Sequence, residues 1–84
     1  MHKFLVRLLS RKIMEKITIR DEYIKLGQAM KLGGMVSSGT DAKFLIQDGE
    51  VTVNGEVCLM RGKKLYPGDR ISFDGQTMEI VRAE

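Results

Sequence analysis

The chain has 84 residues, of which 14 are Lys or Arg and 11 are Asp or Glu, with one Cys and no Trp. This length predicts one small domain. A chain of this size buries only about 60% of its unfolded surface, which excludes a large enzyme cleft with its own walls. The single Cys58 excludes an internal disulfide framework and fits a reducing, cytoplasmic compartment.

The net charge of +3 is concentrated at the start of the chain. Residues 1–13 hold no acidic residue and four basic ones, Lys3, Arg7, Arg11 and Lys12. Because these four charges exceed the total, residues 14–84 carry a net charge of −1. A nucleic-acid partner must therefore be argued from local clusters of basic residues and not from the bulk charge.

Residues 1–13 form a leader that mixes apolar and basic side chains, and three interpretations are open. As a membrane span or signal peptide it is too short, its apolar run is broken by Arg7, and no small-residue cleavage site follows. A basic amphipathic helix that lies on a membrane or a polyanion is the second interpretation. We favour the third, in which Met14 is the functional start. The leader, disordered or an upstream extension, then precedes a single domain over 14–84.

The first elements after the leader are a strand and a helix. Residues 16–20 alternate polar and apolar side chains and include β-branched residues, which predicts a short strand. Over 24–32, apolar residues recur at helical spacing. The pair Gly33-Gly34 then predicts the end of this helix, because glycine adopts the left-handed conformation that closes helices.

A second helix is predicted over about 40–48. Ser38 stands three residues before Asp41, which approximates a capping box at the helix start, and Gly49 predicts its end. The apolar stripe of this helix consists of Ala42, Leu45 and Ile46. Three other side chains fall mostly off the stripe: Lys43, Phe44 and Gln47.

After the second helix the hydrophobic period changes to two. The segments 51–53 and 56–59 flank Asn54-Gly55, a pair that accepts the positive φ angles of a type I′ turn. This pattern predicts a β-hairpin. We expect Cys58 to be a half-buried residue on its second strand.

The last third of the chain combines a basic loop with further turns and strands. The loop 61–64 carries three basic residues, and Pro67-Gly68 is typical of a type II turn. The segments 70–73 and 77–81 flank an Asp-Gly pair and predict a closing hairpin. The expected fold is α+β, with two short helices packed on a small, mostly antiparallel sheet.

Several runs of residues recur together at fixed spacing, namely Gly34-Met35-Val36-Ser37-Ser38, Asp41-Ala42-Lys43, Leu45-Ile46, Gly49-Glu50-Val51-Thr52-Val53-Asn54-Gly55 and Pro67-Gly68-Asp69-Arg70-Ile71. In combination they resemble the S4-type RNA-binding domain over roughly 24–73. The segment 61–66 resembles a small stand-alone bacterial subgroup called YaaA-like. In this family the two helices and the following hairpin form the αL motif, which docks on structured RNA. The resemblance implies an RNA-binding protein that acts on ribosomal RNA or ribosome-bound RNA.

One position departs from the family pattern. Many members carry Arg directly after the loop serine, where this chain has Ser38 or Gly39. We expect Lys43 or the basic loop over 61–64 to supply the phosphate contact in place of that Arg.

The residues themselves suggest an RNA-binding surface around the loop before the second helix. Phosphates are bound by basic side chains, hydroxyls and backbone amides near helix N-termini, and the loop offers Ser37, Ser38 and Thr40. Lys43 and Gln47 are one helical turn apart and project from the same face. Phe44 adjoins this face. An exposed aromatic ring stacks on unpaired bases, but we favour packing of Phe44 against a strand.

Basic residues from three segments form one patch if these segments converge. They are Lys25, Lys31, Lys43, Arg61, Lys63 and Lys64. A single lysine among them is explained equally well as an ordinary solvated side chain. The three charges within 61–64 repel one another unless an anion is near, which favours a binding role for this loop.

No arrangement of residues points to catalysis or to a metal. The one histidine, His2, stands in the leader, and no Ser or Cys has a plausible base nearby in the sequence. His2 and Cys58 are too few soft ligands for a structural zinc. We therefore expect no enzyme activity, no cofactor, no metal and no small-molecule substrate.

A different class of binding module is the alternative. The hairpin and the segment 67–71 are also similar to ubiquitin-like sulfur carriers and related small β-grasp domains. Those carriers act through a C-terminal Gly-Gly, whereas this chain ends in Val81-Arg82-Ala83-Glu84. A β-grasp-like protein-interaction module of a larger assembly, with the leader as its docking helix, stays open. We expect instead a monomeric cytoplasmic protein that binds structured RNA by shape and phosphate contacts, without a membrane.

Overall fold

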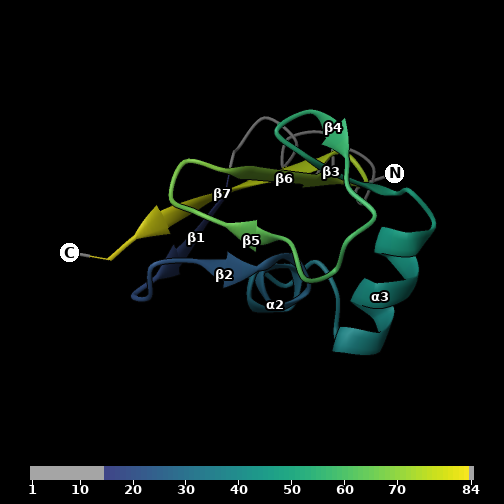
Figure 1. The fold of residues 1–84 in the computed structure, drawn as a ribbon, viewed down its shortest axis with the longest axis horizontal. Helices are drawn as coiled ribbons and strands as arrows, with labels where there is room; N and C mark the ends of the chain where they lie inside the picture. The colour runs from purple at the N-terminus through teal and green to yellow at the C-terminus, as the bar shows by residue number, and fades with distance from the viewer. Residues whose placement is uncertain (1–14, 84) are drawn as a thin grey trace, which may run out of the picture.

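The computed structural model describes residues 15–83, and the predicted leader and Met14 lie outside this range. Figure 1 shows the order of the elements along the chain. They are β1 (Glu15–Ile19), β2 (Ile24–Lys25), α2 (Leu26–Leu32), α3 (Gly39–Gln47), β3 (Val51–Val53), β4 (Glu56–Val57), β5 (Lys64–Leu65), β6 (Arg70–Phe73) and β7 (Gln76–Arg82). The α+β fold class is confirmed.

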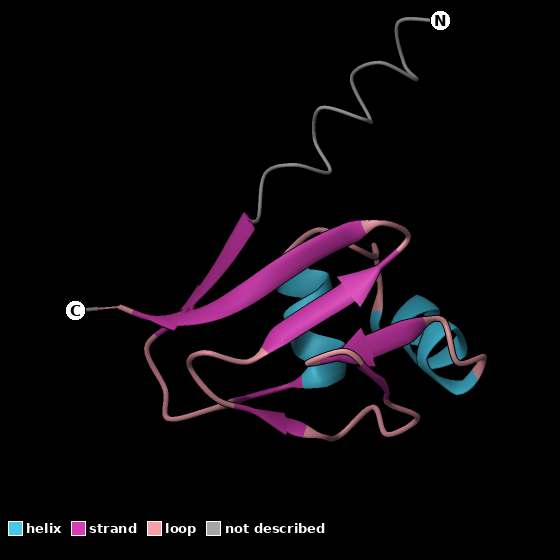
Figure 2. Ribbon diagram, turned by 90° about the horizontal axis from the view of Figure 1, so that it is seen from above, coloured by secondary structure: helices cyan, strands magenta, loops and turns pink. Residues whose placement is uncertain are grey.

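A five-stranded sheet in the order β1-β7-β6-β3-β4 forms one layer of the molecule. Its strand pairs are antiparallel except for β1 and β7, which run parallel. The strands β2 and β5 pair separately as a two-stranded antiparallel ribbon, which we call the β2–β5 ribbon. Both helices lie below the sheet in Figure 1, and Figure 2 shows α2 behind its strands.

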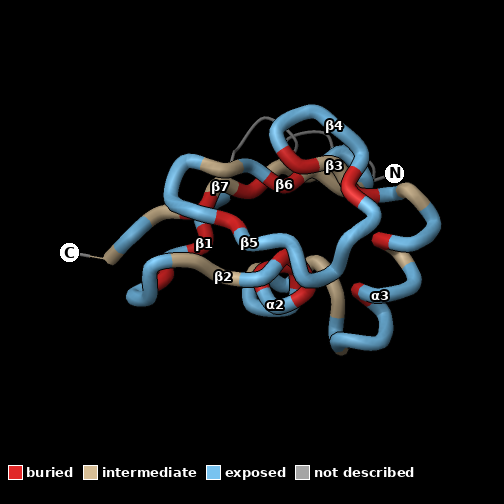
Figure 3. The backbone as a smooth tube through the Cα atoms, viewed as in Figure 1, coloured by how far each residue is buried: buried red, intermediate tan, exposed pale blue. Residues whose placement is uncertain are grey.

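The core lies between the sheet and the helices, where Figure 3 shows the buried positions facing one another. Successive side chains of β1 point to opposite faces of the sheet, so Ile17 and Ile19 are buried while Lys16 and Thr18 are exposed. On α3, Ala42 and Ile46 are fully buried and Leu45 is partly buried, which confirms the predicted apolar stripe. Helix α2 contributes the fully buried Leu26, Ala29 and Met30 to the same core.

Both helices end as their glycines predict. After α2, Gly34 has φ +77°, its N–H donates to the Lys31 carbonyl at 3.1 Å, and the Met35 N–H donates to the Met30 carbonyl at 2.9 Å. These two bonds define a Schellman motif. Helix α3 ends in the same way at Gly49, also with φ +77°. The predicted cap at the start of α3 is confirmed by hydrogen bonding (see below).

The predicted turns of the two hairpins and of the Pro67-Gly68 segment are also present. Asn54 and Gly55 have φ angles of 53° and 87°, and Asp74 has φ 53° before another left-handed glycine, as type I′ turns require. Gly68 has φ +101° at the second central position of its turn, which closes through a 2.9 Å hydrogen bond from the Asp69 N–H to the Tyr66 carbonyl.

The side chain of Asn54 joins two of these turns. Its amide nitrogen Nδ2 donates to Asp69 Oδ1 at 3.0 Å, and its Oδ1 accepts from the Arg70 N–H at 2.9 Å. The other carboxylate oxygen of Asp69 accepts from the Tyr66 N–H at 2.8 Å. The fold alone therefore explains why asparagine stands at position 54.

The structure corrects two boundaries that were predicted from the sequence. Ile24 and Lys25 were placed in the first helix but form β2, because the backbone there pairs with β5 before α2 begins. Cys58 was placed on the second hairpin strand, but β4 ends at Val57. Cys58 is nevertheless buried, and its thiol donates to the Met60 carbonyl at 3.6 Å.

Candidate functional site

A pocket of about 410 Å³ lies between α2, the loop after β4 and the first residue of α3. We call it the basic pocket. Its lining residues are Lys25, Gly27, Gln28, Lys31, Gly39, Arg61 and Gly62. Three of the six basic residues that were predicted to converge, Lys25, Lys31 and Arg61, therefore meet in one concave surface.

Backbone hydrogen bonds hold the loop of Arg61 against the start of α2. The first N–H groups of a helix have no partner within the helix, and the Lys25 side chain does not cap α2. Instead, the Leu26 N–H donates to the Lys63 carbonyl at 2.9 Å and the Gly27 N–H donates to the Arg61 carbonyl at 3.0 Å. These bonds satisfy the helix start and fix the loop that carries Arg61.

Gly27 is the residue over which the Arg61 side chain lies. A Cβ at position 27 would lie 2.7 Å from Arg61 Cγ and 3.3 Å from Arg61 Cδ. Glycine is therefore required for Arg61 to keep its present path into the basic pocket. Sequence reasoning missed Gly27, because a glycine at a helix start predicts no contact with a loop more than thirty residues later.

The Gly27→Ala variant is expected to weaken, about threefold to tenfold, the RNA binding that the sequence predicts, because the new methyl group displaces Arg61 from the pocket. The fold should persist, since alanine favours a helix over glycine by about 1 kcal/mol and Arg61 is flexible. Affinity for a hairpin RNA and thermal unfolding check this together. Gly34→Ala is the control for a glycine-to-alanine change as such, because Gly34 does not line the basic pocket and no described atom lies within 4 Å of a Cβ at position 34. Unchanged affinity in Gly27→Ala would argue against a role for the Arg61 position.

The electrostatics of the basic pocket favour an anion. None of its lining residues is acidic, and among residues 15–83 the structure gives Lys25, Lys31 and Arg61 no carboxylate partner. Gly39 opens the nine-residue helix α3, whose N-terminal end carries a partial positive charge. Three cations and a helix terminus thus border one cavity. This arrangement suits the phosphate groups of a larger ligand.

The other predicted residues of α3 lie beside the pocket and not in it. Lys43 and Gln47 follow Gly39 at intervals of four residues, so they continue the helix face that Gly39 begins. Both are exposed. Thr40 is exposed in the first turn, while the Ser38 Oγ accepts the Asp41 N–H at 3.1 Å. The Ser38 hydroxyl oxygen therefore caps the helix, as predicted.

Lys63 and Lys64 lie outside the basic pocket as well. Lys63 is exposed and contributes its backbone carbonyl to the start of α2. The Lys64 Nζ lies 4.8 Å from the centroid of the Tyr23 ring, which is a cation–π distance. The predicted patch of six is therefore one pocket of three cations with the remaining basic residues on neighbouring surfaces.

Phe44 and Ser37 border a different hollow of about 340 Å³, together with Met35, Val36, Asp41, Leu45 and Phe73. The Phe44 side chain is 60% exposed, so the favoured packing of this ring against a strand was wrong. The reason is helical geometry. Ala42 and Ile46 face the core, and a residue two positions from each is rotated by about 200° and faces away.

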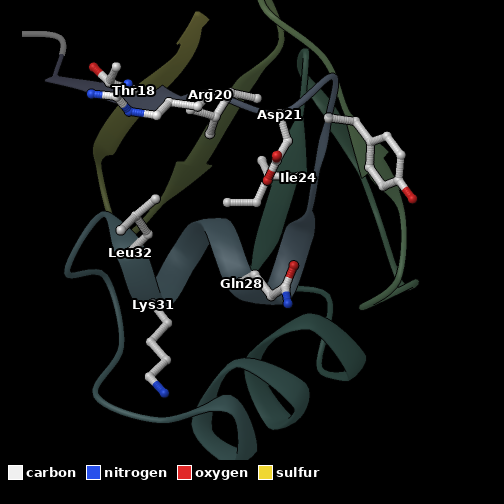
Figure 4. Close-up of a pocket in the computed structure, with 9 residues that line it drawn as sticks. Thr18, Arg20, Asp21, Ile24, Gln28, Lys31 and Leu32 are labelled. Atoms are coloured by element: carbon white, nitrogen blue, oxygen red, sulfur yellow. The ribbon is translucent and has the colours of Figure 1, made fainter. Parts of the chain in front are cut away.

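A further hollow, of about 740 Å³, lies between β1, the segment that leads to β2, and α2. Figure 4 shows that the Lys31 side chain points away from Arg20 and Asp21 on the opposite wall. Apolar residues, including Ile24 and Leu32, share this hollow with one cationic and one acidic side chain from that wall. The mixture fits a polyanion less well than the basic pocket does.

Within residues 15–83, no group of three or more His, Cys, Asp or Glu side chains is placed to hold a metal ion. No helix in this range has the length and apolar character needed to cross a membrane.

Two short helices and a hairpin around a basic pocket, on a mostly antiparallel sheet, define this chain as an αL-motif domain. The sequence model of the S4 domain matches residues 17–81, and the chain belongs to the S4 domain family. This membership decides in favour of the S4 domain over the β-grasp alternative.

Relatives of known sequence and structure agree with this assignment. The probable ribosome maturation protein RlbA of Bacillus subtilis is 44% identical over 59 residues, which cover 70% of this chain and 83% of that protein. The putative RNA-binding protein YbcJ of Escherichia coli is 34% identical over 59 residues, or 70% of this chain and 84% of YbcJ. The solution structure of YbcJ, described as revealing an αL motif involved in RNA binding, matches with a TM-score of 0.65 and 30% identity. This structural match covers 82% of this chain and 89% of the YbcJ chain.

Proposed function

We propose that this protein binds structured RNA without catalysing a reaction on it, and that the basic pocket receives RNA phosphates. The observation that carries the proposal is the meeting of Lys25, Lys31 and Arg61 in a cavity without a carboxylate. Membership of the S4 domain family and the similarity to YbcJ, a putative RNA-binding protein, support the same class of partner. Phosphate contacts position a protein on RNA and need no base readout.

The geometry of the pocket also accounts for the departure from the family pattern. Many S4-type domains carry an Arg directly after the loop serine, where this chain has Ser38 or Gly39. Gly39 and Arg61 line the same pocket. Arg61, a bidentate phosphate ligand, therefore stands where the missing Arg would act, although it comes from a different segment.

We further propose that the bound RNA is ribosomal RNA or another ribosome-associated RNA. The support for this step is the name of the Bacillus subtilis relative, a probable ribosome maturation protein. In this proposal the protein acts in the cytoplasm as a monomer. Residues 14–84 form the binding unit and the leader is dispensable.

A salt titration tests the proposal. Three phosphate contacts predict that the logarithm of the affinity for a hairpin RNA falls linearly with the logarithm of the salt concentration, with a slope of about −2 to −3. Filter binding or fluorescence anisotropy across salt concentrations measures this slope. An affinity that does not change with salt contradicts phosphate recognition.

The same titration on a chain that starts at Met14 separates the pocket from the leader. The shortened chain lacks the four basic residues of 1–13. We expect the slope and the affinity to be retained within a factor of about three, because the pocket lies wholly within the described domain. Loss of most of the affinity would assign the electrostatic contacts to the leader instead.

A further inference from the structure

The β2–β5 ribbon presents an outward surface that shares only Lys25 with the basic pocket. In its register Ile24 pairs with Leu65 and Lys25 pairs with Lys64. Leu65 is fully buried and Ile24 packs against the core, so the alternating neighbours face outward. We call this outward surface the ribbon face. It consists of Tyr23, Lys25, Lys64 and Tyr66.

Contacts among three of these side chains, Tyr23, Lys64 and Tyr66, show that they share one surface. The ring centroids of Tyr23 and Tyr66 are 5.9 Å apart with planes tilted by 50°. The Lys64 Nζ covers the Tyr23 ring at 4.8 Å from its centroid. Tyr66 is 44% exposed, so part of its ring is open to a ligand.

The ribbon face also carries an unfavourable pair of charges. Lys25 and Lys64 stand directly opposite each other on adjacent strands, and like charges in this position repel. An anion between them would relieve the repulsion. Lysines beside an open aromatic ring are typical of protein surfaces that bind single-stranded nucleic acid. The bases stack on the ring, and the lysines contact the phosphates of the backbone.

We propose that the ribbon face binds a single-stranded stretch of RNA that adjoins the structured part held in the basic pocket, an inference that rests on the proposed function. An unpaired base stacks on Tyr66, while Lys25 and Lys64 contact the flanking phosphates. Lys25 lines the basic pocket and also belongs to the ribbon face, so the two surfaces are continuous. Duplex RNA does not fit this face, because its bases are already stacked on one another.

A comparison of two tailed hairpins tests this inference. One hairpin RNA carries a short single-stranded adenine tail, and the other carries a tail of abasic sugar phosphates with the same charge. Each tail is tested at the 5′ end and at the 3′ end of the hairpin. Stacking predicts that the wild-type protein binds the adenine-tailed hairpin about tenfold more tightly. Equal affinity for the two RNAs overturns the inference and leaves the pocket proposal standing.

Substitutions locate the stacking ring. Tyr66→Leu should abolish the preference for the adenine tail, and Tyr66→Phe should retain it. The Tyr66 backbone bonds to Asp69 do not involve the ring, so the fold should survive. Phe44→Leu is the matched control, because Phe44 is an exposed aromatic residue on a different surface. Loss of the preference in Phe44→Leu and not in Tyr66→Leu overturns the assignment to the ribbon face.

Intrinsic fluorescence gives a second readout that does not depend on the hairpin. The chain has two tyrosines, both on the ribbon face, and no tryptophan. Single-stranded oligoadenylate should quench the tyrosine emission of wild type and of Tyr23→Phe, and inorganic polyphosphate should not. If oligoadenylate quenches although hairpins do not bind, the ribbon face stands and the pocket proposal fails. Unchanged emission at saturating oligoadenylate overturns the ribbon face.

Discussion

Replacing Lys31 and Arg61 together by Gln is expected to weaken the binding of a hairpin RNA by about 100-fold at 0.1 M salt. Each phosphate contact contributes roughly tenfold at this ionic strength through the release of counterions. Both side chains line the basic pocket and have no carboxylate partner among residues 15–83. The slope of the logarithm of the affinity against the logarithm of the salt concentration should become less negative by about two, because two phosphate contacts are removed.

The matched control for this variant is Lys16→Gln with Arg82→Gln. These two exposed residues lie on β1 and β7, and neither lines the basic pocket. The control loses the same net charge, so it separates a local site from a general electrostatic attraction. We expect a loss of less than about fivefold. Equal losses in the two variants would falsify the pocket as the phosphate site.

Gly33→Ala is expected to lower the free energy of unfolding by about 2 kcal/mol, which corresponds to a fall of roughly 10 °C in the unfolding midpoint. Gly33 has φ −81°, so its backbone conformation is open to any residue. The obstacle is steric. A Cβ at position 33 would collide with Met78 Sδ and lie 2.9 Å from Ile17 Cδ1, and both side chains are buried. Thermal and denaturant unfolding followed by circular dichroism measure the loss.

Two further variants separate this collision from backbone effects. Gly34→Ala should cost about 1 kcal/mol, because Gly34 has φ +77° and no described atom lies within 4 Å of the added Cβ. Combining Gly33→Ala with Ile17→Val should recover part of the stability that the first change removes, since valine lacks the Cδ1 atom. If the double variant loses more free energy of unfolding than the two single variants lose together, the steric explanation is contradicted.

The local signals of the sequence predicted most of the fold, since these signals act over a few residues. Asn54-Gly55, the glycine of Pro67-Gly68, and Gly34 and Gly49 after the two helices each favour a left-handed backbone conformation, and the structure adopts it at these positions. The β2–β5 ribbon was missed because strands of two residues have no measurable alternation. Its pairing depends on segments that are distant in sequence.

The candidate site was less predictable than the fold. The sequence identified Lys25, Lys31 and Arg61 as basic but gave no means of separating them from Lys43 and Lys63, which do not line the pocket. The separation follows from backbone bonds between α2 and the loop of Arg61. Such contacts leave no trace in composition or periodicity, and the close approach of Arg61 to Gly27 emerges only from the structure.

The parallel pairing of β1 with β7 has a consequence for synthesis. Glu15 pairs with Met78 and Ile19 pairs with Arg82, so the strand β1 cannot form its hydrogen bonds to β7 until the last strand has been synthesised. A partly synthesised chain can form the local hairpin of β3 and β4, but it leaves Ile17 and Ile19 without a sheet to cover. The five-stranded sheet is therefore complete only after the final strand has been translated.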